Sequence, residues 1–245
     1  MKVLVFEIYG DYAHFRKPFS TTSSLTYNVP PRTAVMGIVG AIMGVESGGF
    51  GKSLHVSKLE KQNLKTAVKV ITPIENDRFS MNYSYTKSDA ANKNILHIQV
   101  PVEVVKNPRY RIYVSMDDNK KFREMLEKKE TYFTPCLGIT EFIANIEYIG
   151  EFDAKKLCDS DSETDAINVD SIIYMDYDFE LTFSDNEKIF RETHALSMNA
   201  SRNVTEYCEI AYEANGKGLN LKSEKEIPNL YEFKIQNKME RVILR

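Results

Sequence analysis

The chain has 245 residues, of which 42% are hydrophobic and 11% aromatic. This apolar content is enough for a packed core, and it excludes a globally disordered chain. The net charge at pH 7 is only −3, which does not by itself mark a nucleic-acid-binding protein.

The charge is unevenly distributed along the chain. Residues 1–100 carry 12 Lys and Arg against 7 Asp and Glu, a net charge of +5, whereas the remainder carries 20 against 28, a net charge of −8. The segment 151–188 alone holds 12 acids and 3 bases. We therefore expect the amino-terminal part to face a polyanion, and the acidic segment to face solvent or a neighbouring protein.

The cysteines and the apolar runs bear on compartment and cofactors. Cys136, Cys158 and Cys208 lie far apart and form no C-x-x-C pair, which argues against a disulfide framework and a zinc site. Glu7 interrupts the first apolar run, and the longest run, 34–45, is far shorter than the roughly 20 residues that span a bilayer. We expect a cytoplasmic protein without a signal peptide, metal, cofactor or membrane contact.

A central strand and an apolar helix are predicted first. Residues 2–9 are almost continuously apolar, as in a buried strand. A helix over 32–44 follows Pro30-Pro31, since proline is favoured in the first turn of a helix. Glycine inside a helix costs up to about 1 kcal/mol each, so tight packing against a sheet is the expected reason for three of them. They are Gly37, Gly40 and Gly44.

A long hairpin is predicted next, after a second strand at 64–74. Residues 79–85 alternate strictly between apolar and polar side chains, and residues 95–105 return as its partner strand, with the tip at 86–94. The apolar stripe of this hairpin is more typical of a core than of a ligand site. It consists of Phe79, Met81, Tyr83 and Tyr85.

The remaining elements complete a familiar order. A strand at 110–115 precedes a helix with Phe122, Met125 and Leu126 on one stripe, and a strand at 142–149 follows. Strand, helix, strand, strand, helix, strand is the α+β, ferredoxin-like or RRM-type order, here with an inserted hairpin.

A second unit is predicted after residue 150. The acidic stretch reads as a linker, and four strand-like runs follow at 172–183, 191–197, 204–213 and 230–235. Asn215-Gly216 is a typical type I′ hairpin turn. We therefore predict a domain over 1–150 and, over 151–245, an acidic linker with a small antiparallel β annex.

The loop after the first strand is the main candidate site. Arg16 and Lys17 could neutralise phosphates, while the aromatic residues Tyr12, Phe15 and Phe19 could stack on unpaired bases. Arg32 lies at a helix start, where the dipole attracts anions. The alternative is a solvated basic loop whose aromatic rings pack into the core, with Arg32 in a surface ion pair.

Catalysis at this loop is a weaker hypothesis. Metal-independent RNA cleavage needs a base and an acid, usually from His, Tyr and Lys. The loop offers His14, Tyr12 and Lys17, but a lone histidine in a basic loop is more often a binding or structural residue. We therefore expect no catalytic residues.

Two segments resemble a known family. The run GDYAHFRKPFSTTSSLTYNVPPRTAVMGIVGAIMG at 10–44 is similar to the amino-terminal signature of the Cas-five (Cas5) family. The run TPCLGITEFIA at 134–144, around Gly138, is similar to the glycine-bearing segment of that family. These CRISPR-associated subunits of the RAMP superfamily cap the 5′ end of the guide RNA in type I Cascade complexes. The variant looks like subtype I-B.

The two matches touch roughly the first 150 residues, and the resemblance implies a role in antiviral defence. It implies a non-catalytic subunit that binds the 5′ handle of the guide RNA through the loop, including His14, and through Gly138. It also implies contact with the backbone and large subunits of Cascade, and with DNA only through the assembled complex. The hairpin would be a thumb over the RNA, carrying Tyr83, Tyr85, Lys87 and Lys93. The alternatives are an endoribonuclease that matures the repeat RNA, as in I-C relatives, and a protein-only scaffold.

Overall fold

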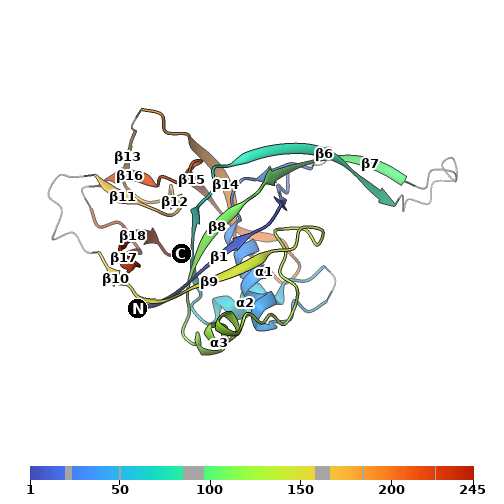
Figure 1. The fold of residues 1–245 in the computed structure, drawn as a ribbon, viewed down its shortest axis with the longest axis horizontal. Helices are drawn as coiled ribbons and strands as arrows, with labels where there is room; N and C mark the ends of the chain where they lie inside the picture. The colour runs from blue at the N-terminus through green and yellow to red at the C-terminus, as the bar shows by residue number, and fades with distance from the viewer. Residues whose placement is uncertain (20–23, 50, 85–96, 158–165, 184, 224) are drawn as a thin grey trace.

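A computed structural model describes residues 1–19, 24–49, 51–84, 97–157, 166–183, 185–223 and 225–245. The molecule is α+β, with antiparallel sheets and few helices (Figure 1). A four-stranded sheet lies at its centre, with the strand order β5-β8-β1-β9 and every neighbour antiparallel. Its strands are β1 (Lys2–Tyr9), β5 (Lys65–Val70), β8 (Arg109–Ser115) and β9 (Asn145–Asp153).

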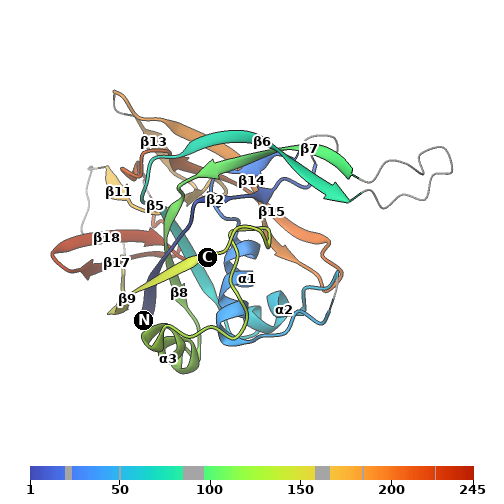
Figure 2. The same ribbon diagram turned by 45° about the vertical axis from the view of Figure 1, so that its right-hand side comes forward.

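Strand β1 is buried on both of its faces, which explains its almost continuous apolar sequence. Leu4, Phe6 and Ile8 point into the main core, while Val3 and Val5 pack in a second cluster with residues of the carboxy-terminal strands. The helices lie together on one side of the sheet, as Figure 2 shows. They are α1 (Arg32–Met43), α2 (Leu54–Glu60) and α3 (Lys120–Lys128).

The predicted hairpin is confirmed and projects from the body of the molecule (Figures 1 and 2). It consists of β6 (Glu75–Ser84) and β7 (His97–Lys106), paired so that Phe79 faces Val102 and Tyr83 faces Ile98. The short strand β2 (Tyr12–Ala13) joins β7 on its other edge. The tip at 86–94 lies outside the described residues.

The carboxy-terminal part forms three small sheets. Their orders are β10-β17-β18, β11-β16-β13 and β12-β15-β14. The run 172–183, expected as one strand, is divided into two short strands of different sheets. The strands are β10 (Lys155–Lys156), β11 (Ile167–Val169), β12 (Ile173–Tyr174), β13 (Glu180–Thr182), β14 (Ile189–Met198), β15 (Val204–Glu213), β16 (Leu219–Lys222), β17 (Leu230–Ile235) and β18 (Lys238–Ile243).

Asn215-Gly216 does not form the expected hairpin turn. The strands on either side of it, β15 and β16, belong to different sheets. The carboxylate of Glu213 accepts hydrogen bonds from the backbone N–H groups of Asn215 and Lys217 instead. Gly216 (φ 77°) lies so close to the carbonyl oxygen of Val70 that a Cβ would be 2.4 Å from it. Tertiary packing therefore overrides the local turn signal.

The main hydrophobic core crosses the boundary predicted at residue 150. It joins Val35 and Ile42 of α1 to Leu196, Ile210 and Tyr212 of the carboxy-terminal strands. The two-domain division stays a prediction, and both parts contribute to one continuous core.

The sequence suggested that the glycines of α1 pack against the sheet, but the structure places them elsewhere. A Cβ on Gly37 or Gly40 would meet His55 of α2, at 3.9 and 3.5 Å. Gly44 is the left-handed C-cap of the helix, with φ 72°, a conformation that favours glycine. The glycine face of α1 is therefore turned toward α2 and the space beside it.

Candidate nucleic-acid interface

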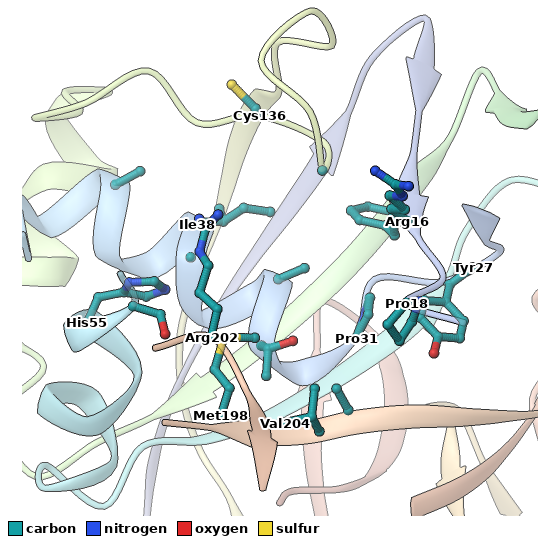
Figure 3. Close-up of a pocket in the computed structure, with 18 of the residues that line it drawn as sticks. Arg16, Pro18, Tyr27, Pro31, Ile38, His55, Cys136, Met198, Arg202 and Val204 are labelled. Atoms are coloured by element: carbon teal, nitrogen blue, oxygen red, sulfur yellow. The ribbon is translucent and has the colours of Figure 1, made fainter. Parts of the chain in front are cut away.

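A cleft with a volume of about 530 Å³ lies beside α1 (Figure 3). The short strand β3 (Phe15–Arg16) and the segment around Gly138 line one part of it. The turn between β14 and β15 and the start of α2 line another part. The floor is the small-residue face of α1, which includes Ala34, Gly37 and Ala41.

Two arginines reach this cleft from different elements. Arg16 comes from β3, and Arg202 comes from the β14–β15 turn and extends over the face of α1 (Figure 3). Both are exposed. Within the described part of the chain, neither guanidinium makes a hydrogen bond or an ion pair. The cleft therefore carries two positive charges that no carboxylate of the described residues neutralises by contact.

The alternation of a short β ladder sets the direction of Arg16. Strand β3 pairs with β4 (Thr26–Tyr27), and the N–H of Lys17 donates to the carbonyl oxygen of Leu25 at 2.9 Å. Phe15 points inward, where it is 3% exposed and packs edge-on against Tyr110. Its neighbour Arg16 must then point outward, because successive side chains of a strand alternate.

Gly138 supports the loop by a close backbone approach. The N–H of His14 donates to the carbonyl oxygen of Leu137 at 3.0 Å. Gly138 adopts φ 98°, and a Cβ there would lie 2.0 Å from the carbonyl oxygen of His14. The close approach expected of this glycine is thus made to the loop behind Arg16.

His14 is buried, with 2% exposure, and both ring nitrogens are occupied. Nδ1 lies 2.7 Å from the carbonyl oxygen of Glu103, and Nε2 lies 2.9 Å from Oγ of Ser24. Since a carbonyl only accepts, Nδ1 donates and Nε2 accepts from the serine hydroxyl in the neutral ring. Burial lowers the pKa of His14 below 6.5, in keeping with a neutral, structural histidine.

Lys17 is held within the protein. Its Nζ lies 2.8 Å from Oε1 of Glu192 and 5.3 Å from the centre of the Tyr27 ring. Burial would raise the pKa of Glu192, but hydrogen bonds from His194 and Lys17 outweigh it and lower the pKa. The phosphate contact expected of Lys17 stays a prediction, and in this arrangement its charge is already paired with Glu192.

The aromatic residues of the loop differ in whether they are buried or exposed. Tyr12 is half-buried between Phe79 and Phe142, with ring centres 5.5 and 5.8 Å away, and Phe15 is in the core. Phe19 is 68% exposed. Of the three rings expected to stack on bases, only that of Phe19 is free to do so, because the other two already pack against protein.

Arg32 does not point toward a ligand at the helix start. Its guanidinium joins α1 to three other parts of the chain, whose carbonyl oxygens lie beside the first turn of the helix. It donates to the carbonyl oxygens of Leu196 (2.9 Å), Leu64 (3.1 Å) and Arg245 (3.2 Å) and pairs with Glu60 (3.3 Å). These contacts match the alternative of an Arg32 paired within the protein, and its phosphate contact stays a prediction.

Two polar residues of the cleft were not among the candidates that the sequence suggested. Arg202 lies about 190 residues from Arg16 in the chain, and no linear motif connects them. His55 is half-buried in the cleft, and its pKa is lowered by burial and by the charge of Arg202. An adjoining hollow of about 500 Å³ shares His55 with the cleft and continues to Phe133.

The structure says less about the hairpin residues, metal ligands and membrane segments considered in the sequence. Tyr83 of the hairpin is 38% exposed, and Tyr85, Lys87 and Lys93 lie outside the described residues. In the described ranges no three His, Cys, Asp or Glu side chains gather as metal ligands. None of the helices described there is long and apolar enough to cross a membrane.

The fold and the cleft define an antiparallel α+β protein with an arginine-lined surface hollow. The family model described as "CRISPR-associated protein (Cas_Cas5)" matches residues 3–210. The chain therefore belongs to the Cas5 family of CRISPR-associated proteins.

Two solved structures share this fold at low sequence identity. A chain of a "CRISPR RNA-guided surveillance complex" is 12% identical, with a TM-score of 0.51 over 86% of this chain and 90% of that one. A CRISPR protein from Archaeoglobus fulgidus is 11% identical, with a TM-score of 0.55 over 99% and 100% of the two chains. No curated protein matches the sequence.

Proposed function

We propose that this Cas5-family chain is a non-catalytic subunit that binds guide RNA in a type I Cascade complex, at the 5′ handle. The observation that carries the proposal is the cleft beside α1, in which the guanidinium groups of Arg16 and Arg202 have no partner among the described residues and the first turn of the helix forms part of the lining. Arginine forms paired hydrogen bonds with phosphate oxygens, and the positive end of a helix dipole attracts the same group.

Single-stranded RNA suits this cleft better than a duplex. The floor of Ala34, Gly37 and Ala41 gives a base a flat apolar surface, and Phe19 offers an exposed ring nearby in the chain. Stacking of unpaired bases and electrostatic contact with the backbone are the two terms of single-strand binding. One of the structural neighbours is itself part of an RNA-guided complex, which supports the same class of ligand.

We also propose a ferredoxin-like core and the I-B subtype. The ferredoxin-like core is supported by the strand order β5-β8-β1-β9 in the sheet, with α1 between β1 and β5 and α3 between β8 and β9 in the sequence. The exposed apolar ends of the hairpin, Tyr83 and Ile98, support a contact with another Cascade subunit.

The absence of catalysis is also proposed, and His14 supports it. An acid–base residue must reach the proton that it transfers, whereas this ring is enclosed and bonded on both nitrogens. The alternative is an endoribonuclease that matures the repeat RNA. A denaturing gel of wild-type protein with repeat RNA in EDTA separates the two. We expect the RNA to stay intact. Efficient cleavage by the wild type that is abolished in His14→Ala would show that the protein is a nuclease.

The binding itself is tested with filter titrations of repeat-derived RNA. We expect the single strand to bind more tightly than its duplex, and the logarithm of affinity to fall linearly with the logarithm of salt concentration. Arg16→Gln should lower that slope by about 0.7, the value for one phosphate contact on a single strand. Lys222→Gln, which removes an exposed charge on β16 outside the cleft, is the matched control.

A further inference from the structure

The turn between β14 and β15 is fixed to the start of α2. The backbone N–H of Ser53 donates to the carbonyl oxygen of Ala200 at 3.0 Å, and its hydroxyl donates to that of Asn199 at 2.7 Å. The side-chain oxygen of Asn199 accepts the N–H groups of Ser201 and Asn203, both at 3.0 Å. These bonds set the position of the turn relative to the cleft before any ligand arrives.

Arg202 is presented by this fixed turn. It adopts the left-handed conformation with φ 63°, which few non-glycine residues take and which is often found where a side chain is aimed for function. Its side chain projects over α1 into the cleft (Figure 3). Burial, and in smaller part the charge of Arg202, lowers the pKa of His55, and the imidazole lines the same cleft.

The opposite wall carries the second guanidinium. Arg16 is held in place by the β3–β4 ladder and by the close approach of Gly138 to the backbone behind it. The distance along the chain between the two arginines means that this cleft forms only when the carboxy-terminal strands pack on α1. The core does pack there, with Leu196 and Tyr212 joining the residues of α1.

We infer that Arg202 is an RNA-binding residue, and that Arg16 and Arg202 hold neighbouring phosphates of one strand from opposite walls of the cleft. The carboxy-terminal sheet is then part of the RNA site and not only a contact for other subunits. This inference rests on the proposed binding of single-stranded RNA. A negative ligand fits because the two guanidinium groups have no partner in the part of the chain that the structure describes, and the apolar α1 face between them accommodates a base better than a carboxylate.

The test uses the full chain and five variants in the filter titration. Arg202→Gln and Arg16→Gln should each lower the salt slope by about 0.7, and the double variant by about 1.4. Lys222→Gln should leave the slope at the wild-type value. Melting curves check folding, and Arg202→Lys, which keeps the charge but loses the planar fork, should keep the slope while weakening binding.

Each outcome decides a different claim. If Arg16→Gln lowers the slope but Arg202→Gln behaves as wild type or as Lys222→Gln, the second wall is not part of the site and the proposed function stands. If wild-type protein binds no RNA at any salt concentration, the proposed function and this inference fail together. Binding of a polyglutamate peptide in place of RNA, lost in Arg202→Gln, would assign the cleft to an acidic protein segment and overturn the inference.

Discussion

Arg16 and Lys17 are adjacent, yet the fold gives their charges different tasks. Arg16 points out of the β3–β4 ladder toward the cleft, whereas Lys17 turns back to Glu192, with side-chain exposures of 19% and 11% for that pair. A charged group this enclosed is costly to leave unpaired, and a hydrogen bond between charged groups contributes about 1.5–3 kcal/mol. The loop is thus anchored by one cation so that the next can face a ligand.

The two basic residues should therefore respond differently to substitution. Lys17→Met should lower the free energy of unfolding by about 2 kcal/mol, because it leaves the enclosed carboxylate of Glu192 without its cationic partner. It should not change the salt slope of RNA binding. Urea denaturation and filter titration measure the two effects. If Lys17→Met is as stable as wild type but has a lowered salt slope of RNA binding, Lys17 contacts the RNA directly.

The lowered pKa of His14 predicts that the protein loses stability in mild acid. Its folded pKa is lowered by burial below the ordinary 6.5, so the unfolded chain takes up the proton first and stability falls as the pH drops below about 6.5. His14→Gln should reduce the decrease in melting temperature between about pH 7.5 and about pH 5.5. His55 and His194 shift in the same direction, so part of the decrease should remain. An unchanged pH dependence would contradict the buried, neutral ring.

At the scale of elements, two glycines near the cleft have opposite roles. Gly138 needs its left-handed conformation and its lack of a Cβ, since the carbonyl oxygen of His14 would be 2.0 Å away. Gly37 lies in a helix, and its nearest neighbour to an added Cβ is Nε2 of His55 at 3.9 Å. One position is closed by backbone, and the other opens into the cleft floor.

The two positions give a matched pair of variants. Gly138→Ala should destabilise the fold by about 3 kcal/mol, as overpacking against backbone does. Gly37→Leu should fold at least as stably as wild type, because a helical glycine costs up to about 1 kcal/mol, yet it should weaken RNA binding by filling the cleft. Gly37→Ala is the control with little added bulk. Wild-type affinity in Gly37→Leu would show that RNA does not use this floor.

At the scale of the whole molecule, a buried charge network joins the central sheet to the carboxy-terminal part. Nζ of Lys69 on β5 lies 2.7 Å from Asp170 and 2.9 Å from Glu240 of β18. Arg111 and the hydroxyl of Tyr113, both on β8, also contact Glu240, at 2.7 and 2.6 Å. Breaking a buried pair by removing one partner costs about 3–5 kcal/mol, so these contacts couple the two parts of the chain.

This coupling predicts one cooperative unfolding transition. Since the core and the network both cross residue 150, calorimetry should show a single peak for the wild type, and Lys69→Met should shift that peak down by several degrees without splitting it. Arg78→Met, which removes a more exposed ion pair with Glu103 on the hairpin, is the control. Two separate peaks in the wild type would support independent domains at the boundary predicted from the sequence.

The sequence predicted the elements whose signals are local. The double proline before α1, the continuous apolar run of β1 and the alternation of the hairpin all appear as expected, because each depends on neighbouring residues. The direction of Arg32 and the pairing of Lys17 depend on strands more than 150 residues away. Arg202 was missed for the same reason, since only the packed fold brings its turn to the cleft.

Cys136 allows the most direct test of RNA binding in the cleft, because it lines the cleft (Figure 3) whereas Cys208 is buried. Its alkylation rate can be followed by mass spectrometry of its peptide, with and without saturating handle RNA. We expect bound RNA to slow this reaction by about 10-fold or more, since the strand must be displaced first. An unchanged rate at an RNA concentration that saturates the filter assay would show that the RNA binds elsewhere on the protein and not in this cleft.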